Sequence, residues 1–291
     1  DFASTIDGAK DFDISSGSGA VTIAGTVGGD VALATLDINA SSGAGTISLK
    51  DIGDTDTQGV TGTSRIGNDT TTTLTLAGTT YKTDAVTYTT KAGENIDLTG
   101  GADTTFTTSN DDITFGTGTL EMGNGSNLII DTGTGGGVID LTPGVMGTSS
   151  ENITLTAGTG NVTVGAIGTG SEIADVTITS TGTTTFNGDF IGGTLENTGP
   201  VIAGADINIG TGAVTFGGTL DSLNGSQAIT FNTPGFEINI TGVIGGTNAF
   251  GTFTITDADK FTYNGGGSIA GFKSGKFSRT GGFAIFNPGP S

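Results

Sequence analysis

Closely spaced aspartates are the side chains in this sequence best suited to chemistry. Asp51, Asp54 and Asp56 lie within one short stretch, and Asp257 and Asp259 flank a single alanine. Carboxylate oxygens on flexible loops are ligands that Ca²⁺ prefers, so these residues are the predicted calcium ligands. The sequence contains neither an EF-hand loop nor the glycine–aspartate nonapeptide of calcium-binding repeats. Calcium is the one cofactor that the sequence brings into consideration.

Catalysis by the most common nucleophiles is excluded, because the chain has no histidine and no cysteine. Serine–histidine relays, thiol nucleophiles and ordinary zinc sites all need one of these residues. The pairs Asp111–Asp112 and Asp11/Asp13 remain, with the triplet at 51–56, as candidates for carboxylate chemistry on a polysaccharide. Turns select aspartate for its local hydrogen bonds, which is the better explanation. No catalytic residue is therefore predicted, and the chain is not expected to be an enzyme.

The charge is unevenly distributed along the chain. The 291 residues carry 29 acidic and 9 basic side chains, a net charge of −20, and residues 92–259 contain no base at all. An acidic body repels the phosphates of nucleic acid, so no nucleic-acid partner is predicted. No apolar run approaches the roughly 20 residues of a membrane helix, so no membrane insertion is expected. The absence of cysteine fits a bacterial protein exported to the cell surface or the medium.

Short strand patterns separated by glycine corners recur along the chain. The stretch Asp206–Leu220 resembles Asp13–Val27 and Ile153–Val164, each with apolar–polar–apolar triplets around a glycine corner. Such triplets have the period-2 pattern of half-buried strands. Equivalent strands fall roughly 22 to 30 residues apart, within the range of solenoid repeats. We predict an all-β parallel β-solenoid, or β-helix, with about ten to thirteen coils and a length of roughly 50 to 60 Å at the usual strand spacing.

Two stretches break this rhythm, at residues 51–70 and 187–206. They are predicted to be loops extruded from the coils or a small inserted β-sandwich. Threonine runs such as Thr177–Thr179 and Thr252–Thr256 are also typical of ice-binding faces. These runs do not recur at one coil position in the sequence, so threonine is interpreted as an ordinary strand former.

The glycine-punctuated repeats over about residues 11–50 and 95–245 resemble those of large secreted bacterial surface proteins. The class is that of filamentous-haemagglutinin-like proteins and autotransporter passengers. The resemblance implies a β-solenoid, export to the cell exterior, and a role in adhesion or in a fibrous coat. The amino-terminal secretion module and the carboxy-terminal membrane barrel of that class are not found in this sequence.

The last part of the chain differs in charge and predicts an assembly contact. We divide the chain into an acidic solenoid body, 1–259, and a basic aromatic segment, 260–291, which either covers the last coil or docks onto the acidic start of another copy. Head-to-tail docking of this kind does not close and therefore builds a filament. The predicted interface consists of Lys260, Phe261, Tyr263, Phe272, Lys273, Lys276, Phe277, Arg279, Phe283 and Phe286 at one end, and of Asp1, Asp7, Asp11 and Asp13 at the other.

The predicted function is thus that of a non-enzymatic extracellular structural protein. Its subunits would assemble with one another, head to tail, into a filament, fibre or surface coat. The alternative is the stalk of a secreted adhesin whose loops bind host or cell-surface glycans. A polysaccharide-active β-helix enzyme is the third function considered.

Overall fold

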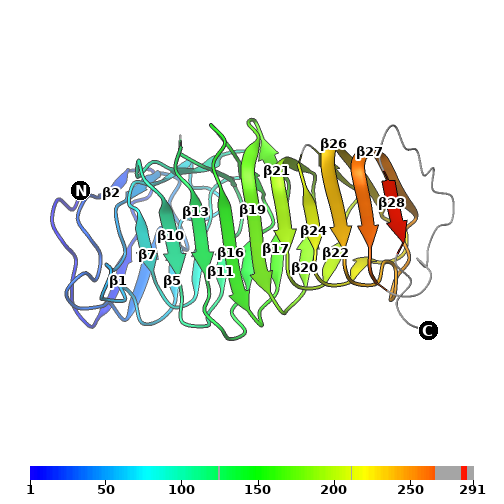
Figure 1. The fold of residues 1–291 in the computed structure, drawn as a ribbon. Coiled ribbons are helices and arrows are strands. Elements are labelled where there is room, and N and C mark those ends of the chain that lie inside the picture. The colour runs from blue at the N-terminus through cyan, green and yellow to red at the C-terminus, as the bar shows by residue number, and fades with distance from the viewer. Residues whose placement is uncertain (124, 211, 266–282, 287–291) are drawn as a thin grey trace.

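The computed structural model describes residues 1–123, 125–210 and 212–265, and the backbone of residues 283–286. Figure 1 shows the described strands stacked side by side into an elongated rod, with the first coil at one end. The described chain is all-β, its strands pair in parallel, and they form a β-solenoid of about 11 turns. This confirms the predicted fold and coil number. No described segment forms a helix long and apolar enough to cross a membrane.

Each coil contributes to three strand ladders, which we call faces 1, 2 and 3. Face 1 contains β2 (Val21–Ile23), β4 (Thr46–Leu49), β6 (Thr73–Leu76), β9 (Asn95–Leu98), β12 (Thr119–Glu121), β15 (Val145–Met146), β18 (Ile167–Thr169) and β23 (Ile207–Gly210). Face 2 contains β7 (Thr80–Lys82), β10 (Thr104–Thr107), β13 (Leu128–Asp131), β16 (Ile153–Gly158), β19 (Ile173–Ser180), β24 (Val214–Phe216) and β28 (Phe283–Phe286). Face 3 contains β1 (Asp11–Ile14), β3 (Thr35–Ile38), β5 (Ser64–Ile66), β8 (Val86–Tyr88), β11 (Ile113–Phe115), β14 (Ile139–Leu141), β17 (Val162–Val164), β20 (Thr184–Phe186), β22 (Val201–Ala203) and β25 (Leu220–Ser222).

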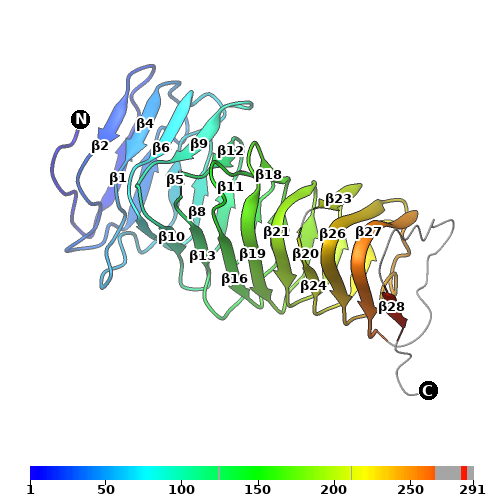
Figure 2. The same ribbon diagram turned by 45° about the horizontal axis from the view of Figure 1, so that its top comes forward.

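Three longer strands bend from face 1 into face 2 without a break. They are β21 (Phe190–Asn197), β26 (Ala228–Ile240) and β27 (Thr252–Tyr263). Their first halves pair with face 1 and their second halves with face 2, which joins these two faces into one 18-stranded sheet beside the 10-stranded sheet of face 3. The turned view of Figure 2 shows the face 1 strands β2, β4, β6, β9 and β12 following one another at the start of the rod.

The core consists of inward side chains that stack from coil to coil. On face 2, paired strands place Tyr81, Phe106, Ile130, Leu155 and Ile178 in one inward column. All of them are buried. Burial of a large apolar side chain contributes about 1.5 to 3 kcal/mol, so the repeated apolar positions of the triplets supply most of the driving force for stacking.

Glycine is required where the corners of successive coils touch. A Cβ atom added to Gly160 would lie 1.9 Å from the carbonyl oxygen of Gly137, and one added to Gly45 would lie 1.8 Å from that of Gly19. No side chain fits at such a distance. The glycine corners seen in the sequence are therefore sites of backbone contact between coils.

A fully buried polar pair lies within the apolar core of the described chain. Asn197 follows Ile178 in the inward column of face 2, and Thr184 lies on the inward side of face 3. Both side chains are completely buried. The Thr184 hydroxyl donates to Asn197 Oδ1 at 2.7 Å, and Asn197 Nδ2 donates to the Gly199 carbonyl oxygen at 2.8 Å. This pair links two faces through the interior of the rod.

The two predicted interruptions differ in outcome. Residues 51–70 contain β5 and the bridge residues Ile52 and Val60, and residues 53–59 between these bridges form no strand, so a loop occupies part of this stretch. Residues 187–206 contain β21 and β22, which pair in parallel with their neighbours, so no sandwich is inserted there. The sequence rhythm fails because the strands are short and because Gly192 and Gly193 occupy the middle of β21.

The predicted boundary between residues 259 and 260 does not coincide with a break in the fold. Strand β27 runs through it from Thr252 to Tyr263, and β28 pairs in parallel with the end of β27. The ladder of face 2 therefore continues into the segment that the charge pattern separates from the body.

Candidate functional site

Most aspartates at the corners of the rod have a structural role. Asp7 Oδ1 accepts backbone hydrogen bonds from Asp30 at 2.9 Å and Val31 at 3.2 Å, one coil further on. The same link from one coil to the next is made by Asp51, Asp103, Asp112, Asp175, Asp189, Asp206 and Asp221. The hydrogen bonds from Asp30 and Val31 lower the pKa of Asp7, because they stabilise its charged form. We call this set the corner ladder.

The predicted calcium ligands are not gathered into one site. Asp51 Oδ1 accepts from the backbone of Thr79 at 2.7 Å, and Asp54 Oδ1 accepts from Asp56 at 2.8 Å. The latter bond is the main cause of the lowered pKa of Asp54. Asp56 lies beside a shallow pocket at a corner of the rod.

The other two predicted ligands, Asp257 and Asp259, lie far along the rod on β27. Within the described parts of the chain, no group of three or more acidic side chains is placed to hold a metal ion. Calcium binding stays a prediction.

The candidate carboxylate pairs are also engaged in the fold. Asp112 Oδ1 accepts from the backbone of Val138 at 2.8 Å, and the pKa of its neighbour Asp111 is raised by burial and, to a smaller extent, by Asp84 and Asp112. Asp11 Oδ1 accepts from the Thr35 hydroxyl at 2.8 Å.

Asp13 lies next to Asp37 on the neighbouring strand of face 3, where Asp37 forms an ion pair with Arg65. Asp13, Asp37 and Arg65 therefore form a row of side chains of both charges on the outer surface of face 3. These structural contacts account for the aspartates at these positions, and no catalytic role is needed to explain them.

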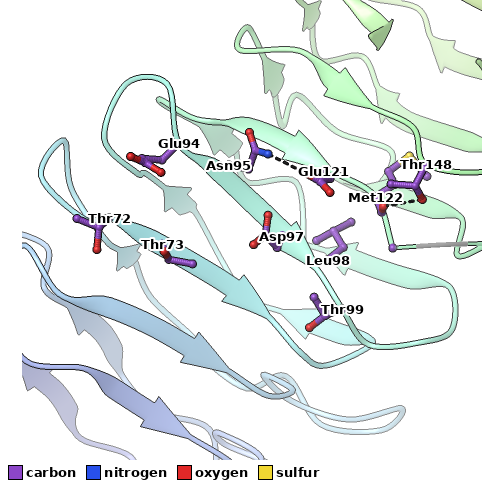
Figure 3. Close-up of a pocket in the computed structure, with 11 residues that line it drawn as sticks. Thr72, Thr73, Glu94, Asn95, Asp97, Leu98, Thr99, Glu121, Met122 and Thr148 are labelled. Atoms are coloured by element: carbon purple, nitrogen blue, oxygen red, sulfur yellow. Dashed lines mark hydrogen bonds between the residues drawn. The ribbon is translucent and has the colours of Figure 1, made fainter. Parts of the chain in front are cut away.

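An acidic groove that sequence reasoning missed lies on the outer side of face 1. Asp97 on β9 and Glu121 on β12 are direct neighbours in the strand register. Figure 3 shows Asn95 reaching Glu121, where its Nδ2 donates to Oε2 at 2.5 Å. Burial and, to a smaller extent, the charge of Glu121 raise the pKa of Asp97. The groove has a volume of about 420 Å³ and is lined by Thr72, Thr73, Glu94, Asn95, Asp97, Leu98, Thr99, Glu121, Met122, Gly123 and Thr148.

A buried carboxylate supports one end of this groove. Glu151 is 1 % exposed and accepts hydrogen bonds from the Thr148 hydroxyl at 2.6 Å, the Thr148 amide at 3.0 Å and the Gly125 amide at 3.2 Å. Burial raises its pKa, but hydrogen bonds from the Thr148 side chain and from the backbone around it outweigh burial, so the net pKa is lowered. The Met122 carbonyl oxygen lies 3.1 Å from the same Thr148 hydroxyl and is its longer, alternative acceptor.

The chemistry of the groove follows from its donors and acceptors. Two adjacent carboxylates, one with a raised pKa, and several threonine hydroxyls can hydrogen-bond a hydroxyl-rich ligand such as a sugar. In the sequence, Asp97 and Glu121 are separated by a full coil. Their proximity could be predicted from the sequence only if the number of residues in this coil were known.

The first coil of the rod is incompletely covered. Phe2, Ile6, Phe12 and Ile14 are half-buried and pack on one side only, against the core. The rings of Phe2 and Phe12 meet edge to face, 5.5 Å apart. In the second coil, the residues stacked on them, Ile23, Val27, Leu36 and Ile38, are 0–1 % exposed. Of the predicted interface residues, Asp1, Asp7, Asp11 and Asp13 lie on this coil and are exposed.

The described residues predicted for the opposite interface have contacts within their own chain. Phe261 and Tyr263 are each 3 % exposed, because they continue the inward columns of Ile238 and Ile240. Lys260 forms an ion pair with Glu237 at 3.1 Å within the chain. These three residues therefore contact their own chain rather than present a docking surface.

The backbone of β28 places Phe283 and Phe286 beside Lys260 and Tyr263 in the ladder of face 2. The remaining residues of this predicted interface, Phe272, Lys273, Lys276, Phe277 and Arg279, lie outside the described residues.

Comparisons with protein families, with curated proteins and with solved structures found no match. The likeness to filamentous-haemagglutinin-like proteins and autotransporter passengers is therefore supported at the level of the repetitive parallel β-solenoid only.

Proposed function

We propose that this protein is an extracellular structural rod, exported from a bacterium, whose copies stack head to tail through their ends. The observation that supports this most directly is the half-buried apolar ring of the first coil, formed by Phe2, Ile6, Phe12 and Ile14. In the described coils that follow, the corresponding positions are buried by stacking. A further coil placed on this ring would bury it in the same way.

The edge of the first coil suits such stacking. Strand β1 pairs with β3 on one side, and no other described strand pairs with its second edge. A free parallel edge offers its backbone groups to an added strand. The exposed Asp7, Asp11 and Asp13 give this end negative charge, whereas residues 260–291 carry four bases and no acid, and one of these bases, Lys260, is paired with Glu237. The opposite net charges of the first coil and of residues 260–291 favour head-to-tail over head-to-head contact.

The test compares polymer formation by the whole chain and by two single variants. Phe12→Glu places a charge on the apolar ring, whereas Phe236→Glu, at a corner of β26 where the side chain is 45 % exposed, serves as the matched control. We expect end-to-end rods in negative-stain electron microscopy for the whole chain and the control, and single rods for Phe12→Glu. A whole chain that stays monomeric, or a Phe12→Glu variant that polymerises normally, would contradict the proposal.

The acidic groove favours a second candidate, the stalk of an adhesin that binds glycans. Its hydroxyls and carboxylates offer polar partners to a sugar ring, whereas the lining residues Leu98 and Met122 are buried in the core. Binding of the whole chain to an immobilised glycan panel, lost in Glu121→Gln and retained in Phe12→Glu, would support this function. Glycan binding by a chain that does not polymerise would place it ahead of the rod proposal.

A further inference from the structure

Threonine side chains line up on the outside of face 2, contrary to the expectation from the sequence. The strand register puts Thr105, Thr154 and Thr177 in one outward column, with Ile129 between the first two. A second column contains Thr107, Thr156 and Thr179, with Asp131 in the corresponding place. The statement that threonine runs do not recur at one coil position is therefore wrong. We call these outward positions of β10, β13, β16 and β19 the threonine face.

The recurrence is interrupted in the sequence, because Ile129 and Asp131 take the place of threonine on β13. Stacked positions on this face are 24, 25 and 23 residues apart, from Thr105 through Ile129 and Thr154 to Thr177. Elsewhere in the rod the spacing varies more, with 19 residues between Asp189 and Asn208 and 29 between Asp51 and Thr80, so a search with a fixed period loses the alignment. The structure restores it because the ladder hydrogen bonds fix which residues are neighbours.

The threonine face is regular and uncharged over most of its extent. Figure 1 shows β10, β13, β16 and β19 side by side across the rod. Neighbouring strands in a sheet are about 4.8 Å apart, and alternate residues along a strand about 6.7 Å apart, which gives a nearly rectangular array of side chains. The first irregularity in register comes at Thr156/Gly158, at the edge of the face. Asp131 is the one charged side chain in the two columns from β10 to β19.

The hydroxyl groups of this array are available for an external partner. No hydrogen bond joins the hydroxyls of these six threonines to another group of the described chain, in contrast to Thr132, whose hydroxyl donates to Gly137 at 2.8 Å. The threonines are half-buried by one another, except for Thr179, which is exposed. Each presents one hydroxyl and one methyl group outward. The strand spacing would set the positions of water molecules that hydrogen-bond to these hydroxyls.

We infer that the threonine face binds the surface of ice. Ice is a flat, uncharged and repetitive partner, and the spacings of its oxygen lattice are on the same scale as the array. Small soluble ligands need a concave site, and the pocket that Thr107 lines lies at the edge of the threonine face, towards Lys82 and Asp56. A second copy of the chain is disfavoured on this face because each copy carries a charge of −20. Water molecules already ordered on the array lose little further entropy when they join the ice lattice.

Ice growth measured with the whole chain and two variants tests this inference. Thr177→Tyr places a bulky ring in the middle of the threonine face, and Thr163→Tyr, at an equally half-buried outward position on face 3, is the matched control. We expect the whole chain and the control to slow ice recrystallisation and to depress freezing below melting. In Thr177→Tyr we expect the activity to fall about tenfold, as for one disrupted central contact. Circular dichroism and thermal unfolding verify that both variants fold.

Two results would overturn the inference. One is the absence of the expected difference in ice growth. Either the whole chain has no effect on ice growth, or the Thr177→Tyr variant slows it as much as the whole chain does. The other is binding to crystalline cellulose or chitin that depends on Thr177 without any effect on ice, which would assign the face to a polysaccharide. Both results leave the rod proposal untouched, because that proposal rests on the first coil.

Discussion

Replacement of Asn197 by leucine tests whether the buried polar pair holds two faces of the rod together. Leucine would continue the apolar column, but it leaves the Thr184 hydroxyl and the Gly199 carbonyl oxygen buried without their partner. Each unsatisfied group costs about 1 to 3 kcal/mol. The added apolar burial of leucine recovers about 1 to 2 kcal/mol. We therefore expect Asn197→Leu to lower the free energy of unfolding by about 2 kcal/mol.

A second substitution separates the hydrogen bond from packing. Thr184→Val in the Asn197→Leu background removes the orphaned hydroxyl and should restore about 1 kcal/mol or more. Ile178→Leu, one coil earlier in the same column, is the control and should cost less than about 1.5 kcal/mol.

The assay must resolve local stability, because long repeat arrays unfold in parts. Urea unfolding gives the overall change, and hydrogen exchange shows whether the loss is centred on β20, β21 and β22. Asn197→Leu as stable as the original chain would refute the reasoning. A double variant no more stable than Asn197→Leu would refute the role of the Thr184 hydroxyl.

The remaining predictions concern acidic groups, a glycine corner and calcium. The pKa of Glu151 is lowered in the fold, so its contribution to stability is complete above the unfolded pKa of about 4.3 and is lost as the pH falls through the folded value. Glu151→Gln should therefore lower the melting temperature at pH 7 and reduce the loss of stability on acidification. Equal pH profiles of stability for the variant and the original chain would contradict this. The pKa of Asp97 is raised, so its charged form lowers the stability of the fold. Asp97→Asn should therefore stabilise the chain at pH 7, and this gain in stability should shrink as the pH falls through the folded pKa. A gain that grows in acid would contradict the prediction. Gly160→Ala should destabilise the chain by about 3 kcal/mol or more, because its Cβ would lie 1.9 Å from the Gly137 oxygen. Gly136→Ala is the control, because the nearest atom to its Cβ is 4.0 Å away, and it should change the melting temperature little. Equal effects of the two substitutions would show that the corner contact is unimportant. If the chain binds calcium, a chelator should lower the melting temperature, and an unchanged melt would end that prediction.

The class of fold followed from local pattern, because each apolar–polar–apolar triplet carries its own information about which side is buried. Val162–Val164 and Val214–Phe216 are strands with that alternation in the structure as in the sequence. The pairing of coils was harder to predict, since corner lengths vary while the core positions do not. Asp97 and Glu121, and the threonines of face 2, become neighbours only through that pairing.

The end of the chain shows a different limit. Charge and aromatic content separated Lys260, Phe261 and Tyr263 from the body, yet the last two simply continue inward columns. Composition reports what a segment contains, whereas burial depends on which strand lies beside it. A basic residue such as Lys260 can also neutralise Glu237 within its own chain, so a change in net charge need not mark a partner surface.

The corner ladder gives the rod a polarity that affects how it can be shortened. In each link the acceptor carboxylate belongs to the earlier coil and the donating amide to the later one, as for Asp51 with Thr79 and Asp206 with Ala228. Removing coils from the carboxy-terminal side leaves carboxylates that water solvates readily. Removing coils from the amino-terminal side leaves backbone amides, which have no such freedom to reorient. Truncation series made from the two sides should therefore differ in solubility even where they retain the same number of coils.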